Sequence, residues 1–148
     1  MRTAAITPPM TILLSLTREH PRAATATVLV VDDEPDILNA IEELLHDAFP
    51  QIRVVTAHSG LEGLEVLRRE SVQLIVTDYK MPGMNGLEFL KEAREVAPKA
   101  PRILVTAFGR DVARQAPNSE AQVDALFNKP IEPGPLLRSV EKLLGAAP

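Results

Sequence analysis

The chain has 148 residues and no cysteine, so it can form one compact domain with a core but neither a disulfide framework nor a thiolate zinc site. Its net charge of −4 argues against a nucleic-acid-binding protein that depends on a basic face. No apolar run reaches the roughly 20 residues of a membrane-spanning helix, and we therefore expect a cytoplasmic protein that does not enter a membrane.

The first 26 residues are rich in Thr, Ala and Pro and lack a clear periodicity. We expect a disordered or variable extension at 1–26, one folded domain at 27–145 and a short tail at 146–148. The apolar segment at 10–16 is shorter than a signal-peptide core and is interrupted by polar residues, so it does not indicate a targeting role.

From residue 27 onward, short apolar segments alternate with segments of helical periodicity. We expect strands at 27–31, 52–57, 72–78, 102–107 and 124–128, and helices at 35–49, 60–70, 86–96 and 133–144. Before the last strand, only a thin apolar stripe at Val112, Ala113 and Ala116 precedes Pro117, so a helix there should be short or mobile. This alternation predicts an α/β fold in which helices cover both faces of a parallel sheet.

Polar residues stand at the ends of four of the predicted strands. Asp32 and Asp33 follow the first strand, Asp78 ends the third, Thr106 lies at the end of the fourth, and Lys129 follows the fifth. Each has a plain explanation alone, as a helix cap, an ordinary strand residue or a solvated charge. Because ligands of open parallel sheets bind at the carboxyl ends of the strands, we expect these five side chains to share one site.

Three clustered carboxylates repel one another and should bind a cation, and an all-oxygen ligand set suits Mg²⁺. With that ion present, Asp78 can act as a nucleophile toward a phosphoryl group. The charge on the phosphoryl oxygens would be balanced by Lys129, while Thr106 donates a hydrogen bond. The turn after Asp78 would bring a main-chain carbonyl near Lys80 to the metal.

Four segments, VLVVDDEPDIL, LIVTDYKMPGMNG, ILVTA and FNKP, occur in this order. Together they resemble the receiver domain of two-component response regulators over residues 27–144. The resemblance implies a flavodoxin-like (βα)5 three-layer sandwich with a five-stranded parallel sheet of order 2-1-3-4-5. It also implies phosphotransfer to Asp78 from a sensor histidine kinase or a histidine phosphotransfer protein. Mg²⁺ would bind at Asp33 and Asp78 with Asp32 in support, and the Lys129–Pro130 bond would be cis.

The chain departs from the family pattern on its fifth predicted strand. In the family, an aromatic residue three positions before the strand-five lysine follows the threonine when the domain is phosphorylated, but here Leu126 occupies that position. The adjacent Phe127 should face the other side of the sheet and so cannot be assumed to replace it. The bulky Phe108, two residues after Thr106, predicts slow self-dephosphorylation.

No output module follows the last predicted helix, so we expect a stand-alone receiver that signals to an unidentified downstream protein or relays to a further histidine. Homodimerisation is left open by the sequence. An aspartate-nucleophile phosphohydrolase is disfavoured because Lys80 stands where such enzymes carry a general acid, and we expect a signalling domain rather than an enzyme. A phosphorylation-independent scaffold remains the alternative, favoured by Leu126 and disfavoured by the complete acidic site.

Overall fold

A computed structural model describes residues 26–115 and 121–146. The predicted extension, apart from Ala26, and the segment around Pro117 that led us to expect a short or mobile helix lie outside the described residues. Within the described ranges, no helix is both long enough and apolar enough to cross a membrane.

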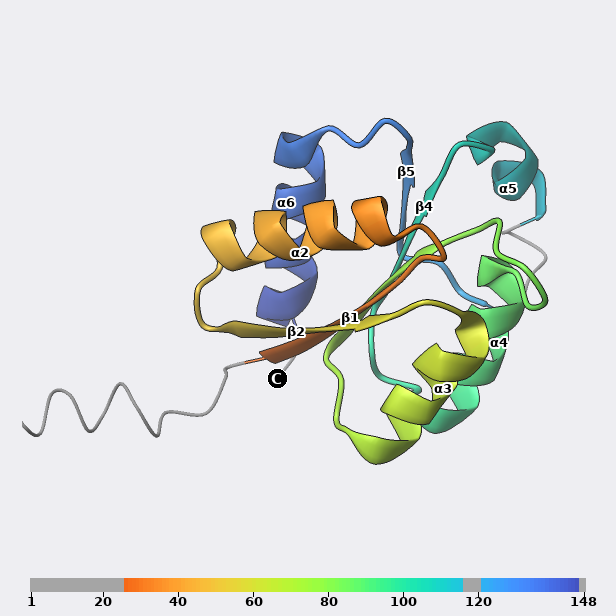
Figure 1. Ribbon diagram of the computed structural model, residues 1–148, viewed down its shortest axis with the longest axis horizontal. Coiled ribbons are helices and arrows are strands. Elements are labelled where there is room, and N and C mark those ends of the chain that lie inside the picture. Colours follow the sequence, from red (N-terminus) through yellow and green to blue (C-terminus); the bar gives the residue numbers. More distant parts are fainter. Residues whose placement is uncertain (1–25, 116–120, 147–148) are drawn as a thin grey trace, which may run out of the picture.

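Strands and helices alternate along the described chain, close to the predicted positions (Figure 1). Their bounds are β1 (Ala26–Val31), α2 (Pro35–Ala48), β2 (Ile52–Ala57), α3 (Gly60–Arg69), β3 (Leu74–Asp78), α4 (Gly86–Val96), β4 (Arg102–Thr106), α5 (Gly109–Gln115), β5 (Ala125–Asn128) and α6 (Pro133–Ala146). The strands form one sheet in the order β2-β1-β3-β4-β5, and each neighbouring pair is parallel. The flavodoxin-like α/β prediction is therefore confirmed.

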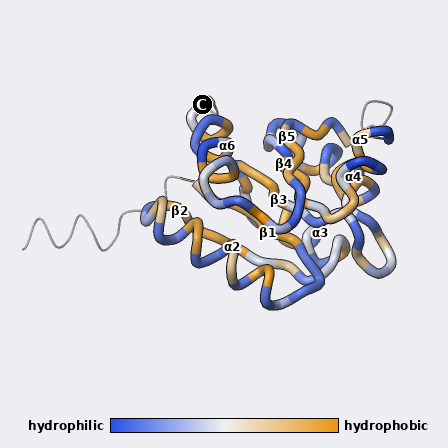
Figure 2. The backbone as a smooth tube through the Cα atoms, turned by 90° about the horizontal axis from the view of Figure 1, so that it is seen from above, coloured by the Kyte–Doolittle hydropathy of each residue, from blue (hydrophilic) through white to orange (hydrophobic). Residues whose placement is uncertain are grey.

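The sheet is buried on both faces because successive side chains of a strand point in opposite directions. In β1, Val28 and Val30 pack into the core beneath α2 and α6, whereas Leu29 and Val31 pack into the core beneath α3 and α4. Figure 1 shows α2 and α6 together on one face of the sheet, and Figure 2 shows hydrophobic residues concentrated along its central strands. This packing fixes the strand ends relative to one another.

The turn between β3 and α4 brings the helix close to the end of the strand. The main-chain N–H of Gly86 donates a hydrogen bond to the Tyr79 carbonyl, with an N···O distance of 2.6 Å. A Cβ atom at Gly86 would lie 2.2 Å from the main-chain oxygen of Asp78, so any other residue would force the chain to move. Asn85 is the N-cap of α4 and forms a capping box in which it exchanges hydrogen bonds with Glu88. The glycine after the turn thus helps to set the position of Asp78.

Candidate functional site

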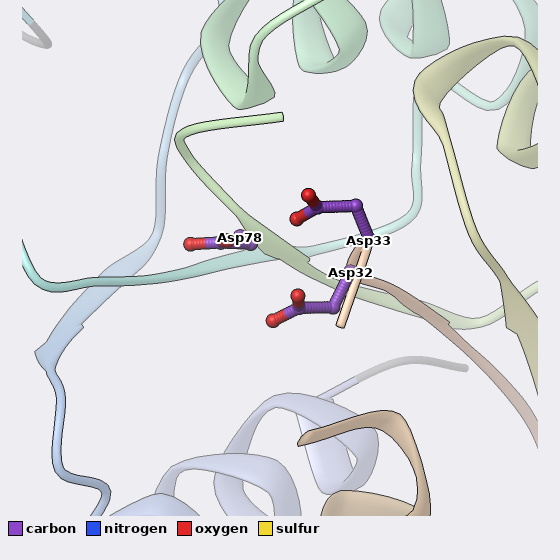
Figure 3. A group of neighbouring side chains, drawn as sticks. All are labelled: Asp32, Asp33 and Asp78. Carbon is purple, nitrogen blue, oxygen red and sulfur yellow. The ribbon is translucent and has the colours of Figure 1, made fainter. Parts of the chain in front are cut away.

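The carboxyl ends of β1 and β3 bring three carboxylates together (Figure 3). Val31 is paired with Thr77 in the register of these strands, so the next residues, Asp32 and Asp78, lie side by side. One carboxylate oxygen from each of Asp32, Asp33 and Asp78 lies within 4.8 Å of the other two. The structure therefore brings the three predicted acidic residues into a single cluster with the separation that one cation could bridge.

Burial makes this cluster electrostatically unfavourable when it is fully ionised. Asp32 is 2% exposed and Asp78 is 7% exposed, whereas Asp33 is half-buried. Burial, and secondly the negative charge of Asp32, raise the pKa of Asp78 above its ordinary value. The Lys129 ammonium and the main-chain N–H of Tyr79 oppose this rise without cancelling it. The ionised site is thus short of positive charge.

Lys129 supplies the cation that the sequence predicted. Its Nζ donates a hydrogen bond to Asp32 Oδ2 at 3.0 Å and lies 3.4 Å from Asp78 Oδ2. Burial acts to lower the pKa of Lys129, but the hydrogen bond to Asp32 and the charges of Asp32 and Asp78 outweigh it and leave that pKa raised. The ammonium is therefore charged at neutral pH, yet it is one positive charge among three carboxylates.

Two main-chain N–H groups orient the buried carboxylates. Tyr79 N–H donates to Asp78 Oδ1 at 2.8 Å, and Glu34 N–H donates to Asp32 Oδ1 at 2.9 Å. A carboxylate has about four lone-pair sites, so each of these groups retains acceptor capacity for a metal ion or for attack on phosphorus. The donor set is entirely oxygen, which fits a hard divalent cation such as Mg²⁺.

Thr106 is fully buried at the end of β4 and is connected to two neighbouring segments. Its hydroxyl oxygen accepts a hydrogen bond from the Phe108 N–H at 2.9 Å. Its main-chain carbonyl accepts one from the Lys129 N–H at 2.9 Å. A movement of the Thr106 hydroxyl would consequently displace the main chain of Phe108 through this hydrogen bond. The sequence had predicted Phe108 only as a side chain that slows self-dephosphorylation.

A pocket of about 440 Å³ opens beside Asp78. Its lining is Asp33, Glu34, Asp78, Lys80, Met81, Pro82, Ala107, Phe108 and Lys129. The Lys80 ammonium lies 4.9 Å from the centroid of the Phe108 ring, a cation–π distance, so these two side chains meet at the wall of the pocket. The Lys80 main-chain carbonyl remains a predicted metal ligand. Sequence reasoning missed Glu34 as a pocket residue, although it directly follows Asp33 in the chain.

The two residues considered for the aromatic position lie on opposite faces of β5, as predicted. Leu126 packs against the core beneath α3 and α4, whereas Phe127 packs against the core beneath α2 and α6. Phe127 is therefore on the wrong side of the sheet to follow Thr106. Phe108, which is 41% exposed, is connected to that threonine by a hydrogen bond from its main-chain N–H.

Comparison with known proteins gives a family model, described as a response regulator receiver domain, that matches residues 28–141. The hydrogenase transcriptional regulatory protein HoxA of Cupriavidus necator is 37% identical over 121 residues, which are 82% of this chain and 24% of that protein. Two further transcriptional regulators are matched over 26% of their length, so this chain corresponds to about a quarter of these relatives.

Solved structures give the same assignment. The CheY-like response regulator receiver domain protein of Methanospirillum hungatei JF-1 has a TM-score of 0.73 and 30% identity, covering 81% of this chain and 94% of that chain. The response regulator TrrA of Thermotoga maritima, in complex with Mg²⁺ and BeF, has a TM-score of 0.70 and 30% identity, covering 80% of this chain and 99% of that chain.

Replacing the Asp78 carboxylate should stabilise the metal-free protein. Because the pKa of Asp78 is raised in the folded state, chiefly by burial and then by Asp32, its ionisation opposes folding at neutral pH. We expect Asp78→Asn to raise the free energy of unfolding by about 1 kcal/mol in EDTA at neutral pH. The difference should shrink toward acid pH, where the folded wild-type protein takes up the proton.

Urea unfolding measured from neutral to acid pH tests this expectation, with Glu65→Gln on the exposed face of α3 as a control for the loss of one surface carboxylate. A less stable Asp78→Asn protein at neutral pH would mean that the attraction of Lys129 outweighs burial and repulsion.

Proposed function

We propose that this chain, which belongs to the response regulator receiver family, accepts a phosphoryl group on Asp78 from a histidine kinase or a histidine phosphotransfer protein. The observation that carries the proposal is the acidic cluster, in which oxygens of Asp32, Asp33 and Asp78 lie within 4.8 Å of one another while Lys129 contacts the two buried members. Receiver domains are in general signalling domains rather than enzymes, and we propose a signalling role for this chain.

Three aspartates would hold Mg²⁺, and the main-chain carbonyl of Lys80 is a further proposed ligand. Bound there, the ion would supply positive charge next to the oxygens of the transferring phosphoryl group. The all-oxygen cluster fits this ion, and the related TrrA has been solved with Mg²⁺ and BeF, which supports the same chemistry here. Asp32 and Asp33 would then balance the positive charge of the ion, and Asp78 would keep one carboxylate oxygen for attack on phosphorus.

Transfer requires a carboxylate oxygen of Asp78 to attack phosphorus as the bond from phosphorus to the donor nitrogen breaks. Lys129 lies 3.4 Å from Asp78 Oδ2, so its ammonium can pair with a phosphoryl oxygen by a small movement. The Thr106 hydroxyl can donate a hydrogen bond to another phosphoryl oxygen while it still accepts one from the Phe108 N–H, because a hydroxyl both donates and accepts hydrogen bonds.

This hydrogen bond would carry the signal to the surface. If the Thr106 hydroxyl moves toward the phosphoryl group, the Phe108 N–H is drawn with it, and Phe108 immediately precedes α5. We expect the changed surface around α5 and β5 to be read by a downstream protein or to alter relay to a further histidine. A scaffold that works without phosphorylation is the second candidate, because Leu126, which packs against the core, stands where the family has its moving aromatic residue.

Intact mass spectrometry after incubation with Mg²⁺ and acetyl phosphate tests the proposed function. We expect the mass of one phosphoryl group to be added to the wild-type protein, to be removed by hydroxylamine and to be absent in EDTA. Asp78→Asn should not gain it, whereas Asp124→Asn, a control at the opposite end of the sheet, should. A stable wild-type protein that never gains the group would favour the scaffold, and a gain in Asp78→Asn would place the acceptor elsewhere.

Phe108 should prolong the life of the aspartyl phosphate. Its ring lines the pocket beside Asp78 and is held against the Lys80 ammonium, so it restricts the approach of water to phosphorus. We expect Phe108→Ala to shorten the lifetime severalfold, measured by the decay of the phosphorylated mass after the donor is removed. Leu61→Ala, which truncates an exposed apolar side chain outside the pocket, serves as the control. Equal lifetimes for wild type and Phe108→Ala would refute the shielding role.

A further inference from the structure

Glu34 has a largely exposed side chain whose carboxylate forms a long ion pair with the Lys129 ammonium. It occupies the position before α2, yet its carboxylate makes no capping hydrogen bond to that helix. Its main-chain N–H orients Asp32, a role that any residue other than proline could fill. The side chain is 63% exposed and lines the pocket together with Asp78. Its chemistry is therefore available to a group that enters the pocket.

The position of this carboxylate places it near the departing part of a phosphodonor. Glu34 Oε1 lies 3.7 Å from Lys129 Nζ, which in turn lies 3.4 Å from Asp78 Oδ2. In an in-line transfer the leaving group stands on the side of phosphorus away from Asp78. Both residues line the same pocket, with Asp78 buried and Glu34 exposed. The leaving group would therefore stand at the solvent-exposed mouth of this pocket, which includes Glu34.

Donors differ in what they present at the mouth. The protonated ring of a phosphoimidazole carries an N–H that can donate a hydrogen bond to a carboxylate, and the positive charge of the ring strengthens this hydrogen bond. Its bond to phosphorus breaks with the electron pair passing to the ring nitrogen, the new bond forms to an Asp78 oxygen, and the ring leaves as neutral imidazole that retains its N–H. The leaving group of acetyl phosphate is instead acetate, which offers no N–H and would be repelled by the Glu34 carboxylate.

We propose that Glu34 is a specificity-determining residue that makes the site prefer phosphorylated imidazole, the chemistry of a phosphohistidine side chain, over acyl phosphates. This inference rests on the proposed function, since it concerns the donor to Asp78. It adds an acceptor for the donor ring that the metal ligands, Thr106 and Lys129 do not provide.

Second-order rate constants for phosphorylation of the intact chain by phosphoimidazole and by acetyl phosphate, followed by intact mass in Mg²⁺, test the preference. In Glu34→Gln we expect the ratio of the first constant to the second to fall by roughly two- to fivefold at low salt, the range for an exposed charged pair. Glu34→Lys should lower the ratio further. Glu65→Gln, an exposed carboxylate on α3, should leave it unchanged. High salt should reduce the effect of Glu34→Gln.

The ratio separates this role from a structural one. A distorted or weakened site would slow both donors together, so an unchanged ratio in Glu34→Gln and Glu34→Lys, with or without slower reaction, overturns the role of Glu34. In that case Asp78 is still phosphorylated and the proposed function stands. If neither donor phosphorylates the folded wild-type protein, it is the proposed function that fails.

Discussion

The contact of Lys129 with both Asp32 and Asp78 is the interaction on which the site depends. It joins residues that are 97 positions apart in the chain and connects the ends of three strands. Without this ammonium, two buried carboxylates would face each other in a medium that screens their repulsion poorly. With it, the cluster is held together but keeps an excess of negative charge. That remaining charge is what gives the site its expected affinity for a divalent cation.

The surrounding structure is built to hold this unfavourable cluster in place. The apolar strands β1 and β3 are buried on both faces, so their ends cannot separate without exposing the core. The turn after Asp78 is fixed by the close approach of Gly86. Thr106 connects the cluster to Phe108, so the same strand ends that hold the charges also contact a surface loop. Packing thus stabilises the site, and Thr106 connects its strand ends to the loop that leads into α5.

Sequence reasoning located the strands well because continuous β-branched and aliphatic runs are typical of strands buried in a parallel sheet. The meeting of Asp32, Asp33, Asp78 and Lys129 followed from their shared place at strand ends. The strand order itself came from the family resemblance and not from periodicity. The third strand begins at Leu74 and not at Val72, because Val72 is buried without joining the ladder. The contact of Lys80 with Phe108 and the place of Glu34 at the mouth depend on loop conformations, for which the sequence carries no comparable pattern.

We expect the three carboxylates, opposed by the Lys129 ammonium, to form a site for a divalent cation. Thermal unfolding of the wild-type protein and of Asp33→Asn, in MgCl2 and in NaCl of equal ionic strength, tests it most directly. The unfolding temperature of the wild-type protein should rise with Mg²⁺ concentration beyond the effect of NaCl, because the ion binds the folded state. The rise should be largely lost in Asp33→Asn. Equal effects of the two salts, or an undiminished rise in the variant, would contradict it.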